Sequence, residues 1–283
     1  MRARIETEAF GDASNHAIFM VSGWAMPKEV MRSFALRLGQ RFYVVLANLP
    51  GISLDEQWIS RSRIGPNYDI DALSEQLIDV APKEAWWIGW SLGGMVSTYV
   101  AARRSSQVVG LITFSASPSF IQRDDWAQGM ALTDFEAFVH HVEQSPAEGL
   151  KRFVMLQAKG AKNERALIKQ LQAFLPIQTL NRAALIGGLR LLKSLDVRRE
   201  LSLLDLPNLH LFGEKDVLVS PHVLPQASPA EVQASLPHNA EQNREINTLQ
   251  QNLVLSHCAH QPFLEEEEAC VRLIENFIDA NNP

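Results

Sequence analysis

The chain has 283 residues, of which 46% are hydrophobic and 20% charged, a balance that excludes intrinsically disordered and fibrous classes of protein. Its 26 basic and 32 acidic residues give a net charge of −6, which disfavours a general nucleic-acid binder because such proteins neutralise phosphates. Because the chain has no apolar run of transmembrane length, no signal-peptide pattern and only two cysteines, Cys258 and Cys270, we expect a cytoplasmic protein that binds neither membranes nor nucleic acid.

Short apolar runs alternate with amphipathic stretches through the first half of the chain, which is the pattern of βα units around a parallel sheet. Strands are predicted at residues 16–21, 42–47, 85–88 and 108–114, and helices at residues 27–38, 70–78 and 92–102. A polar loop is predicted between residues 52 and 67. This order of elements predicts an α/β fold with a mostly parallel central sheet and helices on both faces.

The alternation of strand and helix stops in the middle of the chain. From residue 119 to 200 the apolar residues have helical spacing, and no run has strand character. Strands return at residues 209–212 and 253–255, and a C-terminal helix is predicted at residues 266–278. The simplest arrangement is a core domain of residues 1–118 and 201–283, interrupted by an all-helical cap at residues 119–200.

A nucleophile motif follows the third predicted strand. Gly89-Trp90-Ser91-Leu92-Gly93 matches the G-x-S-x-G pattern and lies directly between a strand and a helix. A turn this tight strains the serine backbone and lifts its hydroxyl clear of the sheet, and the glycines avoid collisions with neighbouring backbone. We therefore predict that Ser91 is a catalytic nucleophile. The alternative is a Gly-rich turn whose serine only caps a helix.

A serine nucleophile needs a base and a group that orients the base. In a sheet of this type the acid and then the histidine follow at the ends of later strands. Asp216 follows the predicted strand at 209–212, and His260 follows the one at 253–255. We predict that His260 accepts the proton of Ser91 and that Asp216 holds the imidazole in the required tautomer.

Other residues near these two strands are weaker candidates for the same roles. The alternative acids are Glu214 and Asp205, and the alternative histidine is His257. A metal site formed by His257, Cys258 and His260 is disfavoured, because the three residues crowd one loop and no fourth ligand is evident. We therefore expect neither a metal nor an organic cofactor.

The negative charge that develops in an acyl-transfer transition state needs two backbone N–H donors. One donor is predicted to be Leu92, the residue after the nucleophile. The other is predicted to come from Gly23-Trp24, after the first strand. The indole of Trp24 would also form a wall of the acyl pocket, unless it is an ordinary core aromatic.

Eight groups of residues, spread over most of the chain, match the pattern of one known family. They are Gly23-Trp24, Asn48-Leu49-Pro50-Gly51, Trp87 to Gly94, Ser115 to Phe120, Arg123 to Trp126, Arg152 to Gln157, Gly187 to Arg198, and Ala259 to Phe263. Through them the chain resembles α/β-hydrolases of the pimeloyl-[acyl-carrier protein] methyl ester esterase type, from biotin synthesis. The resemblance implies the α/β-hydrolase fold, a Ser-His-Asp triad, and serine carboxylesterase activity on the methyl ester of a pimeloyl chain carried by acyl-carrier protein.

The chain also departs from that family's pattern. Ser22 stands where the family usually has histidine, and Asn48 where it usually has aspartate. The segment 52–67 lacks the family's compact Gly-rich turn, and the polar segment 227–251 looks inserted. None of these departures removes a catalytic group. Ser22 and Asn48 border the oxyanion loop, so they bear on substrate fit and rate.

The predicted cap carries an excess of positive charge. Residues 119–200 hold 12 basic and 9 acidic side chains, a net +3, and residues 151–169 alone have a net +5. The residues predicted to dock an acidic carrier protein are Arg152, Lys159, Lys162 and Arg165. They lie close to one helical face unless Gly160 breaks the helix, and such a face would steer an acidic partner. The alternative is a solvated basic face without a partner.

The substrate pocket is predicted to be formed by cap and core together. The expected substrate-binding residues are Trp24, Leu92, Phe153, Val154, Met155, Leu156, Gln157 and His260. The alternative functions are a broad-specificity small-ester hydrolase of the same fold and, in another class, a non-catalytic ligand receptor on a hydrolase scaffold. We expect a monomer whose partner is acylated acyl-carrier protein, a strongly acidic protein.

Overall fold

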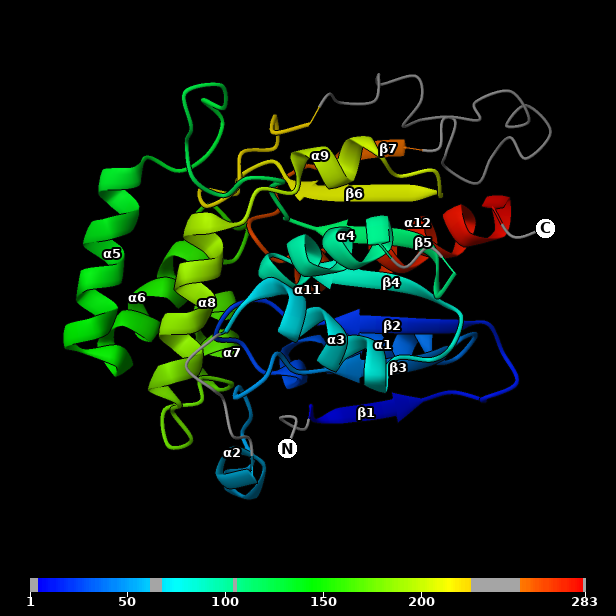
Figure 1. The fold of residues 1–283 in the computed structure, drawn as a ribbon, viewed down its shortest axis with the longest axis horizontal. Coiled ribbons are helices and arrows are strands. Elements are labelled where there is room, and N and C mark those ends of the chain that lie inside the picture. Colours follow the sequence, from blue (N-terminus) through cyan, green and yellow to red (C-terminus); the bar gives the residue numbers. More distant parts are fainter. Residues whose placement is uncertain (1–4, 62–67, 104–105, 225–249, 282–283) are drawn as a thin grey trace.

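The centre of the protein is a seven-stranded sheet in the order β1-β3-β2-β4-β5-β6-β7 (Figure 1). The computed structural model describes residues 5–61, 68–103, 106–224 and 250–281. The strands are β1 (Thr7–Phe10), β2 (Ala17–Val21), β3 (Tyr43–Ala47), β4 (Ala85–Trp90), β5 (Val108–Phe114), β6 (Asn208–Gly213) and β7 (Gln250–Leu255). All neighbouring pairs are parallel except β1 with β3, so the predicted α/β fold with a mostly parallel sheet is confirmed.

Helices cover both faces of this sheet (Figure 1). One face carries η1 (Lys28–Met31), α1 (Arg32–Leu38) and α12 (Glu267–Asn281), and the other carries α3 (Ile70–Val80), α4 (Leu92–Arg103) and α9 (Arg198–Ser202). Successive strand residues point to opposite faces. Phe19 and Trp87 therefore pack with α3 and α4, whereas Ile18 and Trp86 pack with α1 and α12. None of the described helices combines the length and apolar character needed to span a membrane.

β1 and α2 form in stretches where the sequence analysis predicts neither a strand nor a helix. β1 lies at the edge of the sheet, and its residues are alternately exposed and half-buried, so it lacks the apolar run of the other strands. α2 (Glu56–Arg61) lies within the segment 52–67 that is predicted as a loop. The predicted insertion at 227–251 lies outside the described residues, except for Gln250 and Gln251, which begin β7.

The chain between β5 and β6 forms the helices expected of a cap. These are α5 (Leu132–Gln144), α6 (Pro146–Ala158), α7 (Glu164–Gln172) and α8 (Arg182–Ser194). They lie beyond the carboxyl ends of β2, β4 and β6, at the edge where ligands bind in sheets of this type (Figure 1). The predicted boundary at residue 200 falls inside α9, and the division into two domains stays a prediction.

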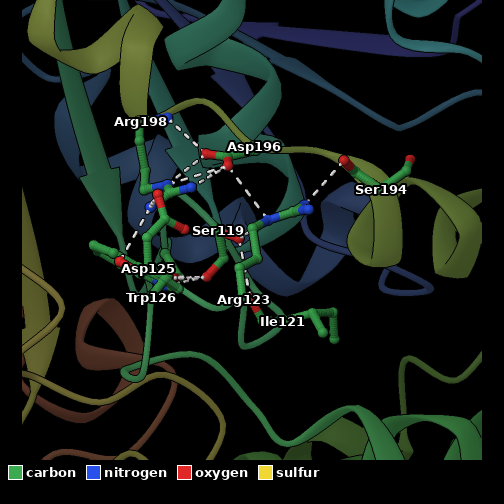
Figure 2. Close-up of polar contacts among 9 residues, drawn as sticks. Ser119, Ile121, Arg123, Asp125, Trp126, Ser194, Asp196 and Arg198 are labelled. Atoms are coloured by element: carbon green, nitrogen blue, oxygen red, sulfur yellow. Dashed lines mark hydrogen bonds and ion pairs between the residues drawn. The ribbon is translucent and has the colours of Figure 1, made fainter.

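The two segments that join these helices to the sheet are tied to each other by an ionic network. Ser119 and Asp196 form an isolated β-bridge. Figure 2 shows Asp196 between the guanidinium groups of Arg123 and Arg198, at 3.3 and 2.7 Å. The hydrogen bonds from Arg198 lower the pKa of the Asp196 carboxyl, and Arg198 also pairs with Asp125 at 3.0 Å. These contacts hold the start of the predicted cap against its end.

A histidine is buried in the middle of β6, and its titration should affect stability. The His210 ring lies 2.7 Å from Thr113 Oγ1 through Nδ1 and 3.0 Å from Asn208 Oδ1 through Nε2. Burial lowers the pKa of His210 from 6.5 to about 4. The unfolded chain takes up this proton first as the pH falls. The free energy of unfolding should therefore fall by roughly 3 kcal/mol between about pH 6.5 and about pH 4 because of this histidine.

Denaturant unfolding across this pH range checks the prediction. The free energy of unfolding of the wild type should fall more steeply with decreasing pH than that of His210→Gln, because glutamine has no proton to bind. Parallel pH slopes in the two proteins would contradict the assignment.

Candidate active site

Ser91 occupies the sharp turn between β4 and α4, where its backbone has a φ of 54°. The turn depends on its glycines. A Cβ on Gly89 would lie 2.4 Å from the Cα of Gly94, and one on Gly93 would lie 2.4 Å from the carbonyl oxygen of Ser22. Only glycine permits this approach of strand and helix, so the local sequence holds Ser91 in a strained conformation at the end of the strand.

Backbone strain is concentrated at this edge of the sheet. The non-glycine residues with positive φ in the described chain are Ala25, Ser91, Ser115 and His257. Each follows the carboxyl end of a parallel strand, β2, β4, β5 or β7. Residues in this sparsely populated region persist only where the surrounding structure stabilises them, and they cluster at functional sites. Their position marks this edge as the candidate active site.

Asp216 and His260, 44 residues apart in the chain, are in direct contact. Asp216 Oδ2 lies 2.7 Å from His260 Nδ1, and both side chains are almost fully buried. The other carboxylate oxygen, Oδ1, accepts the backbone N–H groups of Leu218 and Val219 at 2.8 and 3.1 Å. A carboxylate held as an acceptor places the imidazole proton on Nδ1. His260 Nε2 has no hydrogen-bond partner among the described residues, so no hydrogen bond joins it to the Ser91 hydroxyl, and the Ser91–His260 half of the predicted triad stays a prediction.

Trp90 places His260 beside the turn that carries Ser91. Its indole Nε1 donates to the carbonyl oxygen of His260 at 3.0 Å, and the two rings lie 5.8 Å apart between centroids. Because Trp90 directly precedes Ser91, the histidine loop is anchored one residue from the serine. The nucleophile motif treats this position as variable, so the sequence analysis does not single out Trp90.

The alternative acids and the alternative histidine lie elsewhere. Glu214 is exposed and accepts the backbone N–H of the exposed His257 at 3.0 Å, a hydrogen bond that lowers the pKa of the Glu214 carboxyl. Asp205 is exposed and precedes β6, at the opposite end of the strand. Cys258 is buried and forms no disulfide. Within the described ranges, no three histidine, cysteine or acidic side chains are grouped so as to hold a metal.

The residues predicted for the oxyanion hole lie around the serine. A Cβ on Gly23 would lie 3.3 Å from the Cβ of Ser91, which places the loop after β2 against the turn. Leu92 is the first residue of α4, so its N–H lies outside the hydrogen-bond ladder of the helix. Trp24 is buried, and its Nε1 donates to the carbonyl oxygen of Leu185 in α8 at 2.9 Å. The Trp24 ring therefore joins the core to the cap helices.

The predicted substrate-binding residues of α6 lie on different sides of the helix. Phe153, Val154 and Gln157 are buried, Leu156 is half-buried, and Met155 is 56% exposed. The ring of Phe153 packs edge-on against Trp24 at 4.8 Å between centroids. A helix turns once every 3.6 residues, so five consecutive side chains cannot all face one pocket.

The four predicted docking residues are exposed, but they do not share one helix. Arg152 lies on α6, Lys159 and Lys162 lie in the turn after it, and Arg165 lies on α7. Gly160, with a φ of 91°, follows the end of α6, so the single helical face inferred from their spacing is wrong. None of the four has an ion-pair partner in the part of the chain that the structure describes, which leaves their charge available to another molecule.

Comparison with known proteins places the fold and the site in a family. A family model described as "Alpha/beta hydrolase family" matches residues 18–273. The chain belongs to the alpha/beta hydrolase family. An esterase from Exiguobacterium antarcticum is 20% identical, with 97% of this chain and 95% of that chain covered and a TM-score of 0.74. A hydrolase from Oleispira antarctica is 16% identical, with 98% and 95% covered and a TM-score of 0.76. These two structures share the fold.

Curated relatives of this alpha/beta hydrolase are more similar in sequence. The pimeloyl-[acyl-carrier protein] methyl ester esterase of Serratia marcescens is 31% identical over 265 residues, which cover 93% of this chain and 94% of that protein. The protein of the same name from Vibrio cholerae is 32% identical over 260 residues, with 91% and 92% covered. The resemblance inferred from the motifs is confirmed, and this alpha/beta hydrolase is a carboxylic ester hydrolase.

Proposed function

We propose that this hydrolase removes the methyl ester from pimeloyl-[acyl-carrier protein] through a covalent acyl-enzyme on Ser91. The observation that carries the proposal is the 2.7 Å contact between Asp216 and His260, beside the strained turn that holds Ser91. A buried carboxylate, an imidazole with a free Nε2 and a serine at a strand-to-helix turn are the groups that a serine esterase needs.

The reaction takes place in two halves. Ser91 Oγ attacks the ester carbonyl carbon while His260 Nε2 takes the serine proton, and Asp216 stabilises the imidazolium. The N–H groups of Leu92 and Trp24 bind the oxygen that becomes negative. His260 then gives the proton to the leaving methoxide oxygen, so methanol departs and the acyl group stays on Ser91. In the second half His260 activates a water molecule, which releases the free carboxylate from the serine.

Two features support an acyl chain carried by an acidic protein as the substrate. Trp24 and Phe153 are buried and pack edge-on against each other where α6 meets the loop after β2, so the side chains beside the site are apolar, as a hydrocarbon chain would require. The exposed docking residues are Arg152, Lys159, Lys162 and Arg165. Positive charge of this kind steers an acidic carrier without a large apolar contact. The names of the relatives agree with this substrate.

Methanol release from pimeloyl-[acyl-carrier protein] methyl ester tests the proposal against its alternatives. We expect a higher kcat/KM for the carrier-bound ester than for a short p-nitrophenyl ester, and only the carrier-bound reaction should slow as salt is added. A higher kcat/KM for the small ester would instead indicate a broad-specificity small-ester hydrolase. Absence of turnover with both substrates would indicate a ligand receptor on a hydrolase scaffold.

Charge reversal at the docking residues should separate binding of the carrier from chemistry. The double variant Arg152→Glu with Arg165→Glu should raise KM for the carrier-bound ester by about tenfold and leave the p-nitrophenyl ester almost unchanged, because only the first substrate touches this surface. The matched control reverses Arg37 and Lys83, two exposed basic residues of the core, and changes the net charge equally. Equal losses on both substrates, or the same loss in the control, would remove the docking proposal.

A further inference from the structure

The C-terminal end of α6 reaches from the cap to the histidine of the site. The carbonyl oxygen of Gln157 accepts the backbone N–H of His260 at 3.2 Å. Its side-chain Oε1 accepts an N–H of Gln261 Nε2 at 2.9 Å. Gln261 lies between His260 and α11 (Pro262–Glu265), so the cap holds two consecutive residues of the histidine loop.

The bond between the two amides is fully buried. Gln157 is 1% exposed and Gln261 is 0% exposed. The remaining oxygen of Gln261, Oε1, has no hydrogen-bond partner among the described residues. A buried amide that loses its partner incurs its full desolvation cost, so the paired arrangement is strongly favoured over separation. The distance between the end of α6 and the histidine loop is therefore closely defined.

The turn after α6 also contacts the loop of the aspartate. Gly160 lies against Lys215, the residue before Asp216, and a Cβ on Gly160 would lie 2.9 Å from the Lys215 carbonyl oxygen. The backbone N–H of Lys215 donates to the carbonyl oxygen of Cys258 at 2.8 Å, which ties the aspartate loop to the histidine loop. The end of α6 thus contacts both loops, the one that carries Asp216 and the one that carries His260.

We infer that Gln157 is a positioning residue, which holds His260 in the geometry that proton transfer requires. The inference rests on the proposed function. It adds that the predicted cap affects the catalytic step as well as substrate binding. Arg152 and Lys159 lie on the same helix and the turn after it. A carrier protein bound there would contact the same segment that orients His260.

Gln157→Met tests the inference, because methionine has a similar volume but accepts no useful hydrogen bond from Gln261. We expect kcat for a p-nitrophenyl ester to fall by about tenfold to a hundredfold, with KM changed by less than about twofold. A small displacement of a catalytic base lowers the rate constant by a factor of this size. The Nδ1–H resonance of His260 should shift in the NMR spectrum of the free enzyme. Gln157→Glu keeps an acceptor oxygen and should restore kcat to within about fivefold of the wild type.

Two comparisons separate positioning from a general loss of structure. Gln122→Met is the matched control. Gln122 is exposed in the predicted cap, and its side chain donates to the carbonyl oxygen of Ala127. This variant should leave kcat and the His260 resonance unchanged. Gln157→Met, Gln261→Met and the double variant should lose the same factor in kcat, because each removes one and the same bond.

Either of two results would overturn the positioning role. One is a wild-type kcat and a wild-type His260 resonance in Gln157→Met, and the other is losses that add in the double variant. Failure of the wild type to hydrolyse any ester would count against the proposed function instead. In that case the His260 resonance alone decides the positioning role, because it needs no substrate.

Discussion

Replacing Ser91 with alanine is expected to abolish ester turnover, with kcat falling by a factor on the order of 10⁶. Alanine has no oxygen to attack the ester carbonyl, so no acyl-enzyme forms and His260 has no serine proton to accept. Hydrolysis of a p-nitrophenyl ester at saturating substrate measures the effect. The same assay shows whether a rapid first release of nitrophenol, the sign of an acyl-enzyme, disappears.

Ser97→Ala is the matched control for this variant. Ser97 is buried in α4, the helix that begins after Ser91, and its hydroxyl has no hydrogen-bond partner among the described residues. This change should leave kcat within about twofold of the wild type, because it removes a hydroxyl outside the site. Undiminished turnover in Ser91→Ala would rule out the serine mechanism.

Asp216→Asn is expected to lower kcat by about 10⁴ while the fold stays intact. The amide oxygen can still accept the N–H groups of Leu218 and Val219, but the amide nitrogen then faces His260 Nδ1. The imidazole must accept that hydrogen bond on Nδ1 and carry its proton on Nε2, the nitrogen that should receive the serine proton. Measured kcat, together with thermal unfolding, separates this effect from a loss of structure.

Glu214→Gln provides the comparison, since Glu214 is the nearest alternative acid in the sequence. Its carboxylate accepts the N–H of His257, and a glutamine oxygen can accept the same bond. We expect kcat within about twofold of the wild type. A greater loss in Glu214→Gln than in Asp216→Asn would transfer the role of orienting acid to Glu214.

Elements with strong local patterns are predicted close to their observed bounds. β5 covers residues 108–114 as predicted, and α4 covers Leu92–Arg103 against a prediction of 92–102. The spacing of apolar residues within one short segment is enough to predict such elements. The sequence does not predict β1, because this strand joins the edge of the sheet through backbone pairing and needs no apolar run. α6 and α7 are separate helices because Gly160 turns against Lys215, a residue far away in the sequence.

The turn at Ser91, and the order of the acid and the histidine after it, follow from the sequence alone. A strand, its glycines and the following helix are local features, and a parallel sheet brings the ends of its strands to one edge. The contact of His260 with Asp216 rather than Glu214, and the bond between the side chains of Gln157 and Gln261, depend instead on how the chain folds in three dimensions. The two glutamines are 104 residues apart, and their contact depends on how the cap helices lie on the sheet, a relation that leaves no periodic pattern in the sequence.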